Sequence, residues 1–156
     1  MPVFISHRTA DDALATHVFA HLTRHGIHCY LDNLDREAHT TNDITALILS
    51  RMSLTSHLIA VVTQNTAGSW WVPFEIGVAT ESAKRIASYT RVRVLLPEYL
   101  LKWPALESDS DLNTFAGEYK RDRPLQEKRA GFSRAEQRSD AETFHRILKA
   151  AIGQRA

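Results

Sequence analysis

The chain has 156 residues, of which 44% are hydrophobic and 24% are charged, and its net charge is +1. These values are typical of one folded domain with a real core, and they give no support to a nucleic-acid or membrane partner. The single cysteine, Cys29, excludes an internal disulfide. No segment approaches the ~20 apolar residues that cross a bilayer, and we find no signal peptide. We therefore expect a single cytoplasmic domain over residues 1–156.

Short apolar runs alternate with helical patterns from the start of the chain. A run at 3–5 predicts the first strand, and apolar positions spaced as on one helix face predict a helix over 14–22. Gly26 is a suitable stop for that helix. A second strand is predicted over 27–31, and the segment 32–42 is polar and irregular.

The alternation continues to about residue 97. The sequence predicts a helix over 44–52 and a third strand over 57–62, which is apolar throughout, as in a strand covered on both faces. It then predicts a helix from about residue 70 to Arg85 and a fourth strand over 92–96. This order indicates an α/β fold with a parallel sheet of four to five strands and helices on both faces. Such sheets bind ligands at the carboxyl ends of their strands.

The pattern weakens after Pro97. We expect a helical C-terminal part over 98–156 that ends in a helix near 144–152. Between these, the segment 120–138 has seven Lys or Arg against three Asp or Glu and no clear periodicity. It predicts a solvated basic loop, and a fifth strand is not visible.

The segment 71–75, with the sequence WVPFE, is the most informative local pattern. Pro73 fits the first turn of a helix, and Ser69 is a plausible N-cap. Residues four apart share a helix face, so Trp71 and Glu75 should project together near the positive end of the helix dipole, which favours an ionised carboxylate. Such a pair suits a ligand that carries or develops positive charge. For a motif this short, chance placement is the alternative.

Three motifs together resemble the landmarks of the Toll/interleukin-1 receptor (TIR) domain family. They are, in chain order, Phe4-Ile5-Ser6-His7-Arg8, then Leu31-Asp32, then Trp71 with Glu75. The resemblance covers about residues 2–97, which we expect to form the core of the domain. It implies a flavodoxin-like sandwich with five strands in its usual members.

The motif around Glu75 is similar to that of the enzymatic branch of the family, which cleaves NAD between nicotinamide and ribose. Some bacterial members of this branch, of the Thoeris-like type, make ADP-ribose signals in antiphage defence. The resemblance implies that Glu75 is catalytic, that NAD is a substrate and not a cofactor, and that a separate effector protein receives the nucleotide product. It also implies a homo-oligomer formed through the loop 32–42 and the helix 70–85. The expected substrate-binding residues are Phe4, Ser6, His7, Arg8, Asp32, Trp70 and Trp71.

The chemistry of NAD cleavage needs few groups. Nicotinamide leaves as a neutral molecule, so no general acid is required, unlike in ordinary glycoside hydrolysis. One carboxylate can stabilise the developing oxocarbenium ion. Trp70 and Trp71 could stack on a flat ring, and Arg8 could hold pyrophosphate. A solvated Arg8 and a core-packed Trp70 are the alternative interpretations.

Two other functions remain open from the sequence. A TIR adaptor would assemble with other TIR domains without catalysis, although it has no need of a carboxylate at Glu75. A nucleoside deoxyribosyltransferase has a related sandwich and a catalytic glutamate, but we identify no base-recognition features for it.

His17, His21 and His25 recur at intervals of four residues on the first predicted helix. His-x-x-x-His is a ligand spacing for zinc. No third-ligand motif accompanies it in the sequence. We therefore expect a polar stripe that faces solvent and no metal site.

Overall fold

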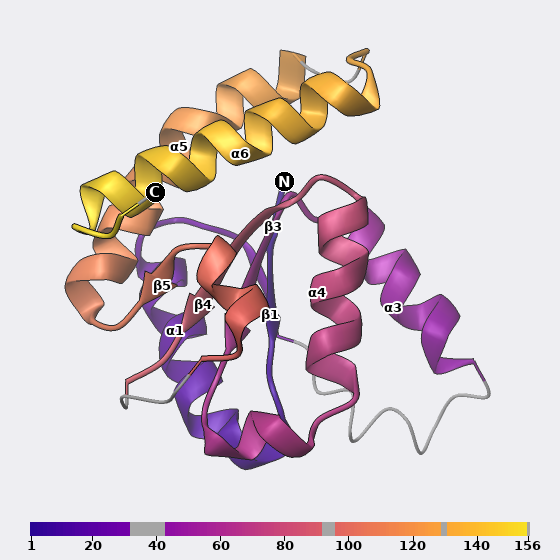
Figure 1. Ribbon diagram of the computed structural model, residues 1–156, viewed down its shortest axis with the longest axis vertical. Helices are drawn as coiled ribbons and strands as arrows, with labels where there is room; N and C mark the ends of the chain where they lie inside the picture. Colours follow the sequence, from indigo (N-terminus) through magenta and orange to yellow (C-terminus); the bar gives the residue numbers. More distant parts are fainter. Residues whose placement is uncertain (32–42, 92–95, 129–130, 156) are drawn as a thin grey trace.

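A computed structural model describes residues 1–31, 43–91, 96–128 and 131–155. Its centre is a parallel sheet with the strand order β2-β1-β3-β4-β5 (Figure 1). The strands are β1 Val3–Ser6, β2 Cys29–Leu31, β3 His57–Val61, β4 Arg85–Tyr89 and β5 Ala105–Leu106. This order is that of flavodoxin-like sheets, so the predicted fold class is confirmed.

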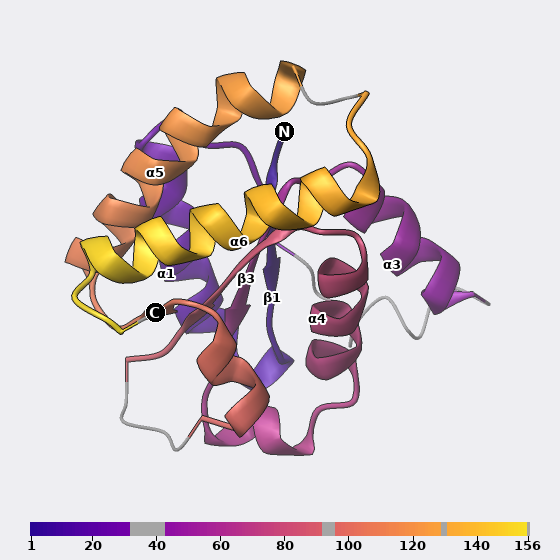
Figure 2. The same ribbon diagram turned by 45° about the horizontal axis from the view of Figure 1, so that its top comes forward.

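Helices cover both faces of the sheet. They are α1 Asp12–Arg24, α3 Ile44–Ser53, α4 Trp71–Glu81, α5 Asp109–Lys128 and α6 Arg134–Ala151, with short 3-10 helices η1 Thr9–Asp11, η2 Gln64–Gly68 and η3 Glu98–Lys102. Figures 1 and 2 show α3 and α4 on one side, α1 on the other, and α6 passing across the end of the sheet where the strands begin. Among the described residues, no helix has both the length and the apolar character needed to cross a membrane.

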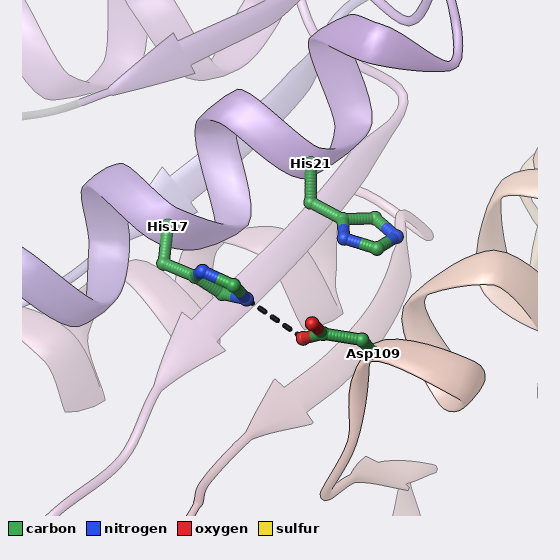
Figure 3. A group of neighbouring side chains, drawn as sticks. All are labelled: His17, His21 and Asp109. Atoms are coloured by element: carbon green, nitrogen blue, oxygen red, sulfur yellow. Dashed lines mark hydrogen bonds and ion pairs between the residues drawn. The ribbon is translucent and has the colours of Figure 1, made fainter.

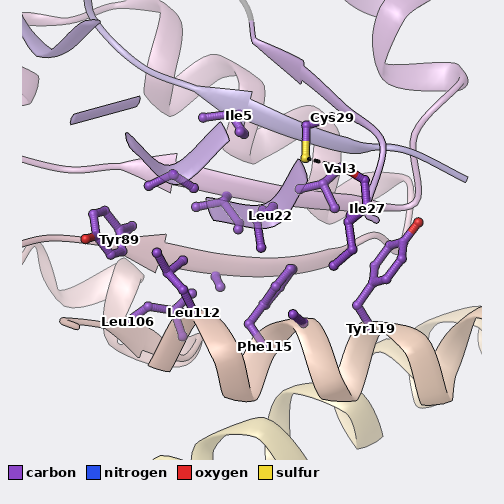
Figure 4. Packing of buried hydrophobic residues seen from close by; sticks show 14 of the residues in the cluster. Val3, Ile5, Leu22, Ile27, Cys29, Tyr89, Leu106, Leu112, Phe115 and Tyr119 are labelled. Carbon is purple, nitrogen blue, oxygen red and sulfur yellow. Dashed lines mark hydrogen bonds between the residues drawn. The ribbon is translucent and has the colours of Figure 1, made fainter. Parts of the chain in front are cut away.

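The alternation of side chains along the strands divides the core into two clusters. Val3 and Ile5 of β1 pack with Leu22 of α1 and Phe115 of α5 (Figure 4). Phe4 points to the other face, into the cluster formed with α3 and α4. Successive residues of a strand face opposite sides, so a strand covered on both sides must be apolar throughout. Each large apolar side chain buried in this way contributes about 1.5–3 kcal/mol to the stability of the fold.

The fourth strand differs from the sequence prediction. The helix expected to reach Arg85 ends at Glu81, and β4 itself begins at Arg85. Of the strand predicted over 92–96, residues 92–95 lie outside the described residues. The strand was missed because a charged residue such as Arg85 is not expected in a buried strand. Arg85 is buried here with an ion-pair partner, since its Nε lies 3.0 Å from Oδ2 of Asp122 on α5. This partner is remote in sequence, so a local pattern could not reveal it.

The prediction of a basic loop near 120–138 is wrong. α5 continues to Lys128, and α6 begins at Arg134. A capping box starts α6: Glu136 N–H donates to Ser133 Oγ, and Ser133 N–H donates to the Glu136 carboxylate. The two-residue strand β5, which is too short to give a periodic signal, and helix α5 both contribute to the core, so the core extends past residue 97.

His145 of α6 connects that helix to the sheet. Its Nε2 accepts a hydrogen bond of 2.8 Å from the backbone N–H of Ile86, which requires an unprotonated nitrogen. Burial, as the larger cause, and the nearby cations Arg85, Lys102 and Lys149 together lower the pKa of His145 to about 3. The histidine is therefore neutral in the folded protein at ordinary pH.

We expect His145→Gln to reduce the acid sensitivity of the fold. In the unfolded chain this histidine binds a proton near its ordinary pKa of 6.5, whereas the folded chain resists protonation down to about pH 3. Its contribution to stability is thus fully present above pH 6.5 and is lost as the pH falls toward 3. A glutamine oxygen can still accept from Ile86 but does not titrate.

Urea denaturation at pH 7 and pH 5 measures this effect. The difference in unfolding free energy between the two pH values should be smaller in His145→Gln than in the wild type by about 1–2 kcal/mol. The control is His28→Gln, at an exposed histidine, which should behave as the wild type. An unchanged difference in His145→Gln would contradict the prediction.

Candidate functional site

The carboxyl ends of β1 and β3 meet where the strand order reverses. From β1 the chain goes to β2 on one side of the sheet, and it then crosses to β3 on the other side. Ligands of such sheets bind outside the strands at this switch point. Here the switch point is flanked by η1, by η2 and by the start of α4.

Glu75 lies one turn into α4, and its side chain is directed at the end of β1. Ser6, the last residue of that strand, donates a hydrogen bond from Oγ to Glu75 Oε2. Ser6 is buried, and Glu75 is only 1% exposed. A hydrogen bond to a buried carboxylate offsets part of its desolvation cost. The structure thus brings together two of the residues that the sequence assigned to the site.

The aromatic residues at the start of α4 lie in different environments. Trp70 is 89% exposed, so the alternative of a core-packed Trp70 is wrong. Trp71 is partly buried against the second core cluster and meets Phe74 edge to face, with ring centroids 6.3 Å apart. The predicted N-cap is wrong by one residue, because Trp70 and not Ser69 is the capping residue of α4. Ser69 Oγ nevertheless accepts a hydrogen bond of 3.3 Å from the N–H of Val72.

His7 and Arg8 bind different neighbours beyond β1. His7 is buried, and its Nε2 lies 2.6 Å from Asp12 Oδ1 at the start of α1. Arg8 Nη1 donates to the carbonyl oxygen of Asn65 at 2.7 Å. Its guanidinium lies so close to Gly68 that a Cβ there would come within 3.0 Å of Nη1. Arg8 is therefore positioned against η2 and is not a freely solvated loop residue.

Asp11 is a residue that sequence reasoning missed. Its buried carboxylate accepts hydrogen bonds of 2.8 and 2.9 Å from Thr63 Oγ1 and one of 2.8 Å from Asn65 Nδ2. These contacts join η1 to η2 across the switch point. In the sequence Asp11 is only an acidic residue near a helix start, and its partners are 52 and 54 residues away.

Two other predicted substrate-binding residues do not contribute to the described site. Phe4 is completely buried in the second core cluster, so its side chain packs against the helices and does not reach the edge of the sheet. The prediction for this residue is corrected to a packing role. Asp32, with the rest of the segment 32–42, lies outside the described residues.

An apolar cavity of about 450 Å³ lies beside the start of α4. Val72, Pro73 and Ile76 of that helix line it together with residues of η2 and of the segment from Pro97 to Leu100. Glu75 is not among its lining residues, because its side chain turns toward Ser6. The Glu75 carboxylate therefore does not line this cavity.

A family model described as a TIR domain matches residues 3–127, which is well over half of the chain. No curated protein matches the sequence.

We expect Asp11→Ala to lower the unfolding free energy by about 1.5–3 kcal/mol, the value of hydrogen bonds to a charged group. The substitution leaves the Thr63 hydroxyl and the Asn65 amide without their acceptor. Urea denaturation measures the loss, and amide hydrogen exchange should become faster over η2. The control is Glu98→Ala, at an exposed carboxylate. A loss below ~0.5 kcal/mol, the range of ordinary surface changes, would show that this bridge does not stabilise the edge.

Proposed function

Since the chain belongs to the TIR domain family, we propose that it cleaves NAD between nicotinamide and ribose. The product in this proposal is an ADP-ribose-type signal, linear, cyclic or conjugated, that acts on a separate effector protein in antiviral defence. The observation that carries the proposal is the Glu75 carboxylate, held by Ser6 at the switch point and preceded by Trp71 at helical spacing. Family membership gives no support to the deoxyribosyltransferase alternative.

The proposed reaction breaks the bond between C1′ of the ribose and the nicotinamide nitrogen. The electron pair of that bond goes to the pyridinium nitrogen, so nicotinamide leaves neutral and needs no proton. The ribose develops oxocarbenium character, and a water molecule or a hydroxyl group of the acceptor then attacks C1′ and releases a proton. The Glu75 carboxylate stabilises the developing positive charge. Ser6 is a positioning residue, because its hydrogen bond fixes one carboxylate oxygen.

Binding groups for NAD are proposed around this carboxylate. Arg8 can bind pyrophosphate, since its contacts with Asn65 and Gly68 already restrict its guanidinium. Trp70 presents a large exposed indole on which a nicotinamide or adenine ring can stack. Trp71, His7 and Asp32 remain predictions as substrate contacts.

The burial of Glu75 suggests that access of the substrate to this carboxylate is regulated. A carboxylate that is 1% exposed cannot touch a substrate until neighbouring groups move. TIR domains commonly self-associate, and the exposed Trp70 and Phe74 lie at the start of α4. We propose that association through α4, which lies within the predicted segment 70–85, and through the segment 32–42 opens the site and switches catalysis on.

The same observations favour one alternative, a non-catalytic TIR adaptor. An interaction module needs exposed apolar residues such as Trp70, and it has no need of an accessible Glu75. The two functions differ in one result. Only the enzyme releases nicotinamide when the pure protein is incubated with NAD.

We expect Glu75→Gln to reduce nicotinamide release at least ~100-fold, as for the loss of a preorganised charge-stabilising group. Glutamine keeps the size of the side chain and can accept the hydrogen bond of Ser6, so the fold should be retained. Nicotinamide release followed by chromatography measures activity, and circular dichroism verifies folding. The matched control is Glu81→Gln, at an exposed carboxylate of the same helix. Near-normal turnover by Glu75→Gln would remove the catalytic assignment.

We expect the specific activity to rise with protein concentration, because association opens the site. Trp70→Ala should shift this rise to higher concentration and leave the melting temperature unchanged, since exposed substitutions alter stability by under ~0.5 kcal/mol. Light scattering at each concentration relates activity to the oligomeric state. Phe132→Ala is the control, at an exposed aromatic residue before α6. A rate strictly linear in enzyme over a thousandfold range, with a monomer throughout, would exclude the mechanism.

A further inference from the structure

We propose that α1 and α5 together hold a zinc-type divalent cation through His17, His21 and Asp109 (Figure 3). His17 Nε2 lies 2.7 Å from Asp109 Oδ1, and one ligand atom from each residue lies within 4.8 Å of the other two. Zinc bonds of about 2.0–2.2 Å place neighbouring tetrahedral ligands roughly 3.4 Å apart. Small rotations of these side chains therefore suffice for coordination.

The expectation of a histidine stripe facing solvent is wrong, because the stripe faces α5. His21 is buried, and Nε2 of His21 and Nε2 of His25 each lie 2.8 Å from Oδ1 of Asn113 on α5. The ring centroids of the consecutive histidines are 6.1 and 5.3 Å apart. The carboxylate that completes the set is 92 residues from His17, which explains why sequence spacing showed no third ligand.

The donor set selects the class of metal ion. Two imidazoles and one carboxylate suit Zn²⁺ and its neighbours among the transition metals, whereas Mg²⁺ and Ca²⁺ prefer oxygen ligands. A fourth position is left for water. A metal ion bound here bridges α1 and α5, so it stabilises the packing of the C-terminal helices on the sheet.

Arg91 competes with the metal ion for the same ligands. Its Nη2 lies 3.0 Å from Asp109 Oδ1 and 3.1 Å from His17 Nε2, so the protein already places a cation between two of the proposed ligands. The side chain is 47% exposed and can turn toward solvent. This competition distinguishes a metal site at these residues from binding by scattered surface histidines. Removing Arg91 should increase the zinc affinity of the proposed site, whereas it should not change the affinity of scattered histidines.

The experiment titrates the full chain, first freed of metal with EDTA, with zinc chloride. Calorimetry should give one zinc ion per chain. At a zinc concentration 100-fold above Kd, the melting temperature should rise by roughly 5–10 °C, and EDTA should reverse the rise. Cobalt(II) bound in place of zinc should show the intense visible absorption of a tetrahedral site.

Three variants locate the binding. Asp109→Asn should weaken zinc binding at least tenfold, whereas Arg91→Ala should strengthen it roughly three- to tenfold by removing a nearby positive charge. Neither substitution is in a core position, so both variants should fold. His28→Ala, at an exposed histidine outside the cluster, should bind zinc as the wild type does.

Two results would overturn the proposal. The first is no zinc-dependent rise in melting temperature up to millimolar zinc. The second is binding that Asp109→Asn and Arg91→Ala leave unchanged, which would mean adventitious coordination by other histidines. Neither result bears on NAD cleavage, since none of these residues belongs to the site around Glu75.

Discussion

β1 lies between β2 and β3, and its parallel pairing on both sides determines where the loops of the carboxyl edge begin. Val3 pairs with Cys29 on one side and with His57 on the other, so Ser6 comes to the end of its strand beside Ala60 of β3. The next residues of the chain must then leave the sheet over the switch point. The contacts of Asp11 and Arg8 with η2, and of Ser6 with Glu75, all follow from this placement.

The polar groups at this edge are held mainly by one another. Asp11 and Glu75 are both buried carboxylates, and a buried charge is costly unless hydrogen bonds compensate for it. Asp11 accepts from Thr63 and Asn65, whereas Glu75 accepts from Ser6. Asp11 thus joins η1 to η2, whereas the Glu75 side chain can serve the proposed catalysis only if the surrounding groups move. This contrast is the structural basis of the proposed activation by assembly.

The sequence predicted those parts of the fold that depend on local patterns. The first three strands and the first two helices follow from apolar runs and helical spacing, and the placement of Ser6 and Glu75 at one edge follows from topology. β4 could not be predicted, because Arg85 is buried through Asp122, a partner on a distant helix. Asp11 was missed for the same reason, since no local signal marks a carboxylate whose hydrogen-bond partners lie more than 50 residues away.

α1 connects the two polar regions of the molecule. Its first residue, Asp12, lies against His7 next to the switch point, and its later turns place His17 and His21 against α5. The apolar face of the same helix packs on the sheet through Leu22. Because a packed helix moves as a rigid element, contacts with α5 restrict α1 along its whole length, including the end that borders the candidate site. α5 therefore helps to define the position of the β1–α1 connection, although it lies far from it in the sequence.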